Sequence, residues 1–300
     1  MWTGLFRALS LLTILLGIFA ATRGLVRALP GDPLETLIAE SGTSIPPQIL
    51  REEFNLDKPF FAALISDLKK ASVGDFGLSL LTRQPVAEVV AKRFLNTLAL
   101  SLLALIIGLT VSLLLGLSAA AKPSGLADTI CTVYGGIAAA LPTPWLGPII
   151  ILTFAVIIPI FPVGGNIIPP ALTLALGFSG VWARLIRERV RDTLMTGSAT
   201  GARARGVPEW KVILKYGFAP ASAGLAAYLG TRFGGLLAGA FVTEVIFNWS
   251  GLGSLLVESV LQRDYMMVEG ATFVAAGACL MGTWAGDLAQ NFINPVRQTK

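Results

Sequence analysis

The chain has 300 residues, of which 54% are hydrophobic and 14% are charged, and its net charge is +5. About a quarter of the residues in soluble domains are charged, so this composition excludes an ordinary water-facing globule and indicates a membrane protein. The sequence contains no histidine, which removes the commonest general base and metal ligand. Its 2 cysteines lie in apolar stretches and predict neither a disulfide framework nor a zinc site. The positive charge is interpreted as membrane topology and not as nucleic-acid binding.

Six apolar stretches are long enough to cross a bilayer, which takes about 20 residues of helix. The first is interpreted as a retained helix because it lacks a clear cleavage site before Arg23. The third is interrupted by prolines, so we expect a kink or an irregular end there. The stretches cover about residues 5–22, 97–121, 130–160, 167–186, 222–247 and 270–292. The prediction is an all-α, polytopic membrane protein with six transmembrane helices.

Positive charges between the fourth and fifth stretches set the predicted orientation. Short loops rich in Lys and Arg stay in the cytoplasm, so this connection and, with six spans, both chain termini are predicted to be cytoplasmic. Arg23 and Arg27, at the outer end of the first stretch, weakly oppose this orientation. The bases are Arg184, Arg187, Arg189, Arg191, Arg203, Arg205, Lys211 and Lys215, and the acids among them are Glu188, Asp192 and Glu209.

Three regions follow from this topology. Residues 1–26 are predicted to form an N-terminal transmembrane helix, and residues 27–93 an external loop subdomain. Residues 94–300 are predicted to form a five-helix transmembrane core with a cytoplasmic loop at about 187–217. The apolar spacing in the external region predicts short amphipathic helices, which are interpreted either as a cap packed on the bundle or as a docking surface for an external partner.

Three ionisable residues lie within the later stretches, namely Arg232, Glu244 and Asp287. A charge at membrane depth is costly and usually faces the bundle interior, a cavity or a partner, so each is a candidate for a polar pathway or an interface. For Glu244 and Asp287, hydration near the membrane surface is an equal alternative. The sequence has no G-x-x-x-x-G-K-[ST] motif for nucleotide phosphates. We therefore expect no ATPase site, no cofactor, no metal and no enzymatic activity in this chain.

Residues 197–217 form a small, basic, glycine-punctuated segment in an otherwise apolar half of the chain. Gly206 favours a helix stop at positive φ, and Pro208 with Glu209 favours the start of a second helix. The spacing places Lys211 and Lys215 on one face of that helix. Such a helix–turn–helix knob suits insertion into a groove of a soluble partner. The alternative is a surface helix bound to anionic lipid.

The chain resembles the inner-membrane permease subunits of bacterial ABC importers, in the branch for dipeptides, oligopeptides and nickel. The resemblance covers essentially the whole chain. It rests on many short motifs in order, since no one of them is specific alone. They include RALPGDPL (27–34), GDFGLSL (74–80), LPTPWLG (141–147), ARARGVPEWKVILKY (202–216), TEVIFNWSGLGSLL (243–256) and NPVR (294–297).

The resemblance implies a multi-pass permease of the bacterial inner membrane that forms a translocation pathway with a second, homologous permease. Two cytoplasmic ATPases, which bind ATP and magnesium, and an external solute-binding protein complete the importer. The basic loop is then the coupling element that docks into a cleft of an ATPase. The general motif has a glutamate six residues before the glycine, where this sequence has Thr200, so no glutamate-mediated contact is assigned. The predicted coupling residues are Thr200, Gly201, Ala202, Arg203, Ala204, Arg205, Gly206, Glu209, Lys211 and Lys215.

Peptides are the predicted solute, with nickel chelates, opines and sugars as alternatives that the resemblance leaves open. A different class of function is a secondary transporter driven by an ion gradient, which normally shows internal repeats with interrupted helices. No such repeat is visible in this sequence. An intramembrane enzyme is a third class, and the absence of histidine and of a catalytic motif argues against it.

Overall fold

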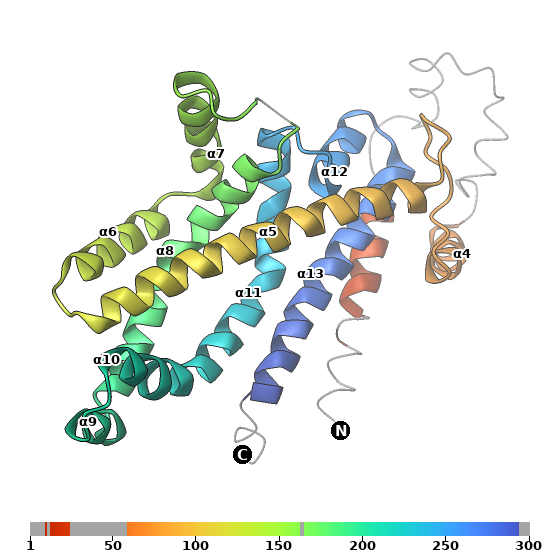
Figure 1. Cartoon of the computed structure of the whole chain (residues 1–300). Coiled ribbons are helices and arrows are strands. Elements are labelled where there is room, and N and C mark those ends of the chain that lie inside the picture. Colours follow the sequence, from red (N-terminus) through yellow and green to blue (C-terminus); the bar gives the residue numbers. More distant parts are fainter. Residues whose placement is uncertain (1–9, 11–12, 25–58, 163–164, 294–300) are drawn as a thin grey trace. The chain divides into compact units, whose positions relative to one another are not determined.

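The computed structural model describes residues 10, 13–24, 59–162 and 165–293 of the chain. Apart from an isolated antiparallel bridge between Leu78 and Pro85, the elements named in these ranges are helical, so the predicted all-α class is confirmed. After an N-terminal helix at Thr13–Gly24, the elements (Figure 1) are α4 (Phe60–Ser72), α5 (Val86–Ala121), α6 (Leu126–Ala140), α7 (Thr143–Ile151), η1 (Leu152–Ile157), α8 (Ile168–Leu194), α9 (Gly197–Ala204), α10 (Glu209–Lys211), η2 (Val212–Phe218), α11 (Ala219–Ile246), α12 (Leu252–Leu261) and α13 (Tyr265–Ile293).

Two helices are long and apolar enough to cross a membrane, α5 and the Tyr265–Ala285 part of α13. A third span is formed if the bent pair Leu126–Ala140 and Thr143–Ile157 counts as one. This pair bends by 106°, next to Pro142, which confirms the irregularity predicted from the prolines. The described residues therefore contain two helices, or three spans with the bent pair, that are long and apolar enough to cross a membrane, and six spans remain a prediction.

The chain divides into two compact units, and α5 and α13 each contribute to both. The first unit comprises Met1–Asn96 and Ser250–Leu280. In it, the segment between α4 and α5 is fastened to the start of α13. The Ser79 hydroxyl donates to the Asp264 carboxylate over 2.5 Å, and the Leu80 N–H donates to the other oxygen of that carboxylate over 3.2 Å. Of the predicted external subdomain, residues 27–58 lie outside the described residues.

A buried charge cluster, formed by Arg23, Asp67 and Glu269, joins three helices of the first unit. The Arg23 guanidinium lies 2.6 Å from the Asp67 carboxylate of α4 and 2.8 Å from the Glu269 carboxylate of α13. All three side chains are almost fully buried. Arg23 therefore has a structural role, and this explains why a positive charge lies at an end of the first stretch where the predicted topology does not favour one.

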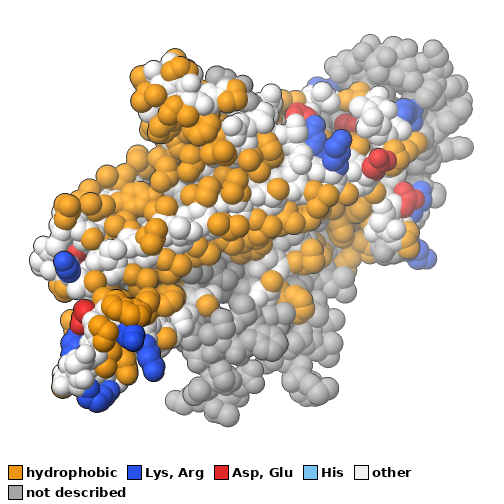
Figure 2. Space-filling view, in the orientation of Figure 1, with side chains coloured by type: hydrophobic (Ala, Val, Ile, Leu, Met, Phe, Trp, Pro, Cys, Tyr) orange, Lys and Arg blue, Asp and Glu red, His pale blue; other side chains and the backbone are white. Residues whose placement is uncertain are grey.

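The second unit comprises Thr97–Trp249 and Met281–Lys300. Helix α8 is its centre and packs against α6, α7, η2 and α11. Small residues let these helices approach closely. A Cβ on Gly180 of α8 would lie 2.9 Å from the Tyr134 carbonyl of α6, and one on Gly282 of α13 would lie 3.1 Å from the Phe233 ring of α11. Such contacts are expected where helix association depends on packing. The outward face of α5 is apolar, as Figure 2 shows, and suits contact with lipid.

Candidate functional site

The basic segment 197–217 folds as a tight hairpin after α8. Helix α9 ends at Ala204, and Gly206 follows with φ of +76°. The Gly206 N–H donates to the Arg203 carbonyl over 2.9 Å, and the Val207 N–H donates to the Ala202 carbonyl over 3.1 Å. These two bonds form a Schellman motif, in which a left-handed residue closes the helix end. The predicted turn at Gly206 is therefore confirmed, with the positive φ that favours glycine.

Small side chains seat the hairpin on the end of α8. Ala199 and Ala202 of α9 are fully buried and pack with Val212 against Val190 and Leu194 of α8. On the far side of the hairpin, a Cβ added to Gly217 would lie 2.9 Å from the Leu194 side chain. The Gly217 carbonyl also accepts a hydrogen bond of 2.6 Å from the Thr193 hydroxyl. Both ends of the hairpin are thus fixed to α8, so a displacement of the hairpin also displaces α8.

An ion pair braces the two arms of the hairpin. The Arg203 Nη2 lies 2.7 Å from Glu209 Oε1, and the Arg203 Nε donates to Glu209 Oε2 over 3.1 Å. Arg203 also donates to the Leu194 carbonyl at the end of α8 over 3.3 Å. The hydrogen bonds from Arg203 hold the pKa of the Glu209 carboxyl below its usual range. The sequence interpretation placed Glu209 in the first turn of a helix, which is confirmed, but did not foresee this pair across the turn.

The second arm is less regular than predicted. The α-helix after Pro208 covers just Glu209–Lys211, and the chain continues as a π-helix over Val212–Phe218. Pro220 lies two residues after its end and has no N–H to donate to the preceding turn, which accounts for an irregular helix at this point. Lys211 and Lys215 are nevertheless both exposed, while Val212 between them is buried.

The outer surface of the hairpin is basic and partly apolar. Arg205, Lys211 and Lys215 are exposed and form no ion pair with another described residue, and Lys211 lies 5.2 Å from the Trp210 ring centroid. Trp210 is 61% exposed and Met195 is 81% exposed. Figure 2 shows the Lys and Arg side chains gathered where α9 and α10 lie. Thr200, Gly201 and Ala204 occupy the first arm, where Thr200 and Ala204 are exposed and Gly201 is half-buried. An exposed aromatic ring among cations is a surface suited to a protein partner.

Two of the basic residues before the hairpin serve a structural purpose that the sequence interpretation missed. Asp128 of α6 lies 2.8 Å from Arg187 and 2.9 Å from Arg191, both on α8. Arg191 also donates to the Ala119 carbonyl of α5 over 2.8 Å. This Asp128 network ties the cytoplasmic end predicted for α8 to α5 and α6. The signal available in the sequence was that Asp128 is the one acid between Glu88 and Glu188.

The three candidate pathway residues lie in different settings. Glu244 is fully buried in the second unit, and its carboxylate accepts a 2.6 Å hydrogen bond from the Thr97 hydroxyl. Glu244 is therefore not hydrated at the surface of this fold. Arg232 is exposed on α11, stacks 5.1 Å from the Tyr228 ring centroid and borders a cavity of about 540 Å³. Asp287 lies in α13, and its side chain is outside the described part of the structure.

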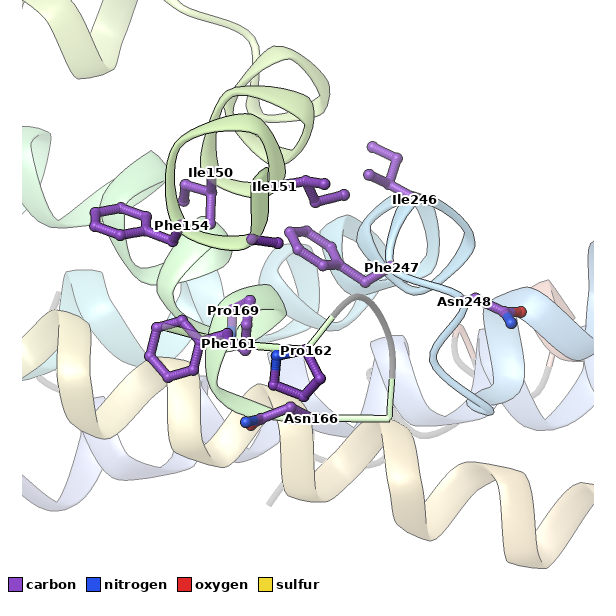
Figure 3. Close-up of a pocket in the computed structure, with 11 residues that line it drawn as sticks. Ile150, Ile151, Phe154, Phe161, Pro162, Asn166, Pro169, Ile246, Phe247 and Asn248 are labelled. Atoms are coloured by element: carbon purple, nitrogen blue, oxygen red, sulfur yellow. The ribbon is translucent and has the colours of Figure 1, made fainter. Parts of the chain in front are cut away.

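A smaller cavity of about 170 Å³ lies where η1, the start of α8 and the end of α11 meet (Figure 3). Its lining is mostly apolar and includes Phe154, Phe161 and Phe247. The Asn166 side chain at its edge accepts a hydrogen bond from the Ile168 N–H and so helps to start α8. None of the described residues that border this cavity is charged. Within the ranges that the structure describes, no group of three or more His, Cys, Asp or Glu side chains could hold a metal ion.

Comparison with known proteins identifies the family of the chain. Residues 112–297 match the family model of the binding-protein-dependent transport system inner membrane component. The glutathione transport system permease protein GsiC of Escherichia coli strain K12 is 31% identical over 302 aligned residues, which cover 99% of this chain and 97% of that protein. The proteins of the same name from Shigella dysenteriae serotype 1 and Shigella boydii serotype 4 are 31% and 30% identical over the same shares. The chain therefore belongs to the family of binding-protein-dependent transport system inner membrane components, and it is a permease of an ABC importer.

Proposed function

We propose that this chain imports peptides across the bacterial inner membrane as one of a pair of permeases, and that its hairpin at residues 197–217 docks into a cleft of a cytoplasmic ATPase. The full coupling loop covers about residues 187–217. The relatives named above are glutathione permeases, and glutathione is a small peptide, which supports this substrate class. Family membership already favours an ATP-driven importer over a secondary transporter driven by an ion gradient.

The proposed topology has six spans, with both termini and the hairpin in the cytoplasm and residues 27–93 outside. The basic residues on α8 and the hairpin support this orientation because such loops stay in the cytoplasm. Helices α8 and α11, with 27 and 28 residues, are long enough to serve as two of the spans at 1.5 Å per residue. Cysteines introduced at position 205 and at position 75 test it. The topology predicts that an impermeant thiol reagent labels the second and not the first in intact cells.

The single observation that carries the coupling role is the construction of the hairpin. Its turn is closed by two backbone hydrogen bonds and one ion pair, and its alanine face is packed on α8. A loop with these internal contacts is rigid, so a force applied at its tip is transmitted to α8. Its outward side still offers three cations and Trp210 to a partner.

This arrangement supports a mechanism in which the permease does no bond-making chemistry. ATP and magnesium bind to the partner ATPases, and closure of the ATPase pair moves the hairpins that are seated in them. Because each hairpin is fixed to α8, its movement shifts the spans between inward-open and outward-open states. ATP drives this change through its different affinity for the two states.

The test is a matched pair of glycine variants in the assembled transporter. Gly206→Val places a β-branched residue at a φ of +76°, which strains the turn. Gly197→Val is the control, because Gly197 lies in the same hairpin with an ordinary φ and with no atom within 4 Å of an added Cβ. We expect Gly206→Val to abolish peptide-stimulated ATP hydrolysis and uptake together and to weaken co-purification of the ATPase, while Gly197→Val retains all three.

Charge is tested in the same way with Arg205→Glu, and Lys122→Glu is the control because Lys122 is an exposed cation outside the hairpin. A lipid-bound hairpin would lose about 1 kcal/mol of membrane affinity for each cation removed and would keep the ATPase attached. Wild-type hydrolysis and uptake in both Gly206→Val and Arg205→Glu, with the ATPase still co-purifying, would overturn the coupling role. Uptake of a nickel chelate, an opine or a sugar in place of peptides would overturn the substrate class.

A further inference from the structure

A cavity of the second unit lies along α8 and α11. Its volume is about 540 Å³, within the range of about 300–1,000 Å³ that is usual for small-molecule sites. Residues of α6, α7, α8 and α11 line it. All of these belong to one compact unit, so the cavity is a property of a single packed part of the chain.

Arg232 is the charged residue among those that line this cavity. It lies midway along the 28-residue α11, about 20 Å from either end at 1.5 Å per residue. An arginine at such a depth requires a polar partner or a polar path. No ion pair or hydrogen bond involving Arg232 is found among the described residues, and its recorded contact is the Tyr228 ring, 5.1 Å from the guanidinium carbon.

The stacking on Tyr228 determines which part of Arg232 is available. Tyr228 and Arg232 are four residues apart on α11 and therefore share a face of the helix. The guanidinium carbon lies over the ring, 5.1 Å from its centroid, and this contact uses the π face of the ring and no hydrogen bond. The guanidinium carries five N–H donors, and two of them match the two oxygens of a carboxylate. Arg232 is thus held in place by an aromatic ring while its N–H donors remain able to bind an anion.

The floor of the cavity is kept open by glycines. A Cβ built on Gly235 would have no atom within 4 Å, and one on Gly239 would meet just the Leu174 side chain at 4.0 Å. These glycines differ from Gly282 of α13, whose Cβ would press on Phe233. Close helix packing explains Gly282 but does not explain Gly235 or Gly239. The open space at those two positions belongs to the cavity.

The opposite wall is aromatic and accommodates varied apolar groups. Phe178 and Trp182 of α8 both line the cavity, and their ring centroids are 4.2 Å apart. Aromatic surfaces provide contact area without demanding a particular side chain. The cavity therefore combines one fixed anion-binding group with a wall that tolerates different side chains.

We propose that this cavity is a substrate subsite in which Arg232 binds a carboxylate of the peptide in transit. The inference rests on the proposed function, because it assumes that α11 borders the peptide pathway. The C-terminal carboxylate is the anionic group that all unmodified peptides share, so one arginine serves peptides of any sequence. A free divalent metal ion is repelled by the same charge, and a peptide amide lacks the second oxygen needed for the paired hydrogen bonds.

The test measures binding at the cavity without the external binding protein. In the assembled transporter, Cys131 and Cys279 are replaced by alanine and Gly235→Cys places a thiol in the open floor. The labelling rate of this thiol is measured at increasing concentrations of trialanine or of trialanine amide. We expect trialanine to protect the thiol and the amide to protect it about tenfold to a hundredfold less well, the size of a lost charged hydrogen bond.

Variants of Arg232 then identify the group responsible. Arg232→Met should remove the difference between the two peptides, and Arg232→Lys should retain part of it because the charge remains without the paired donors. Gly224→Cys on the same helix is the control, since its Cβ also has free space but lies about 16 Å away along α11. Its labelling should not respond to either peptide.

The outcomes separate this inference from the function on which it rests. A transporter that imports trialanine, but in which the two peptides protect Gly235→Cys equally with and without Arg232, contradicts the carboxylate site and leaves peptide import standing. Protection by anionic phospholipid and by neither peptide also contradicts it and identifies a lipid site. If no peptide is imported by the wild-type assembly, the proposed function itself fails.

Discussion

Arg23 and Arg232 both lie in apolar helices, but their surroundings in the fold are opposite. Arg23 is buried and lies between two carboxylates at 2.6 and 2.8 Å, in a cluster that joins three helices. Arg232 is exposed along a cavity, and an aromatic ring, not an acid, is its recorded partner. A buried charge that is paired with opposite charges of the same protein contributes to the structure. A charge beside an open cavity remains able to bind a ligand.

This difference shows that a charged residue in an apolar stretch of sequence cannot be assigned a functional role from its residue type and its sequence neighbours. The two arginines have similar apolar neighbours in the sequence. Their roles diverge because acids from α4 and α13 converge on Arg23, whereas glycines and aromatic rings surround the cavity beside Arg232. The following substitutions test this contrast through the stability of the folded protein.

The largest effect is expected from Arg23→Met. The substitution keeps the approximate volume of the side chain but removes the guanidinium that lies between the Asp67 and Glu269 carboxylates. Breaking a buried pair in this way typically destabilises a protein by about 3–5 kcal/mol. We expect a sharply lower thermal midpoint of the purified transporter in detergent, together with a lower yield.

Arg93→Met is the matched control within the same unit. Arg93 lies 3.3 Å from Glu258, but the two side chains are 25% and 47% exposed. Exposed pairs contribute about 0–1 kcal/mol, so this substitution should change the midpoint little. Equal midpoints for the Arg23 and Arg93 variants would mean that the buried cluster is not a structural tie.

A smaller loss of stability is expected from Thr97→Val. The hydroxyl of Thr97 donates to the buried Glu244 carboxylate over 2.6 Å, and valine has nearly the same shape without a donor. Removing one partner of a buried polar group costs about 1–3 kcal/mol. Thr110→Val on the same helix is the control, since that exposed hydroxyl donates to the Ile106 carbonyl of its own helix. If both variants have the same midpoint, the Thr97 hydroxyl does not stabilise the Glu244 carboxylate.

Glu209→Gln should have a local effect on the hairpin. The Arg203–Glu209 pair is about half exposed, so its contribution is about 0–1 kcal/mol. We expect amide hydrogen exchange across residues 197–211 to accelerate by at most about fivefold. The pKa of Glu209 is lowered in the folded protein. Its contribution is therefore complete above the usual pKa of a glutamate and is lost as the pH falls through the lowered value. Unchanged exchange at neutral pH would show that the hydrogen bonds at Gly206 and Val207 hold the turn without the pair.

The smallest change in stability is expected from Arg232→Met. The ring contact with Tyr228 is worth about 0.5 kcal/mol at a solvent-accessible site, and no described acid is left unpaired. The thermal midpoint should therefore equal that of the wild type, even though binding of peptide carboxylates is lost. A destabilisation as large as that of Arg23→Met would make Arg232 a second structural charge and would remove the contrast between the two regions.

The amino-acid sequence by itself determined the class of the protein and much of its local structure. Hydrophobic content and apolar periodicity are properties of neighbouring residues, so they predicted helices and membrane insertion without knowledge of the fold. The turn at Gly206 was predictable because glycine adopts a positive φ, here +76°, at the lowest steric cost of any residue. The break between α6 and α7 was predictable because a proline in the interior of a helix removes a backbone hydrogen bond and clashes with the preceding turn.

The tertiary structure alone decided which charged residues have partners. Asp67 and Glu269 are separated by about two hundred residues, and Arg23 is far from both, so no local pattern brings the three together. The same holds for Asp128 with Arg187 and Arg191. Arg203 and Glu209 are six positions apart, and their pair depends on the turn between them. Ion pairs and cavities depend on distances between helices, and these distances are set by packing along the whole chain. For this reason the sequence could nominate Arg232, Glu244 and Asp287 on equal terms, whereas the fold buries Glu244 against Thr97 and places Arg232 beside an open cavity.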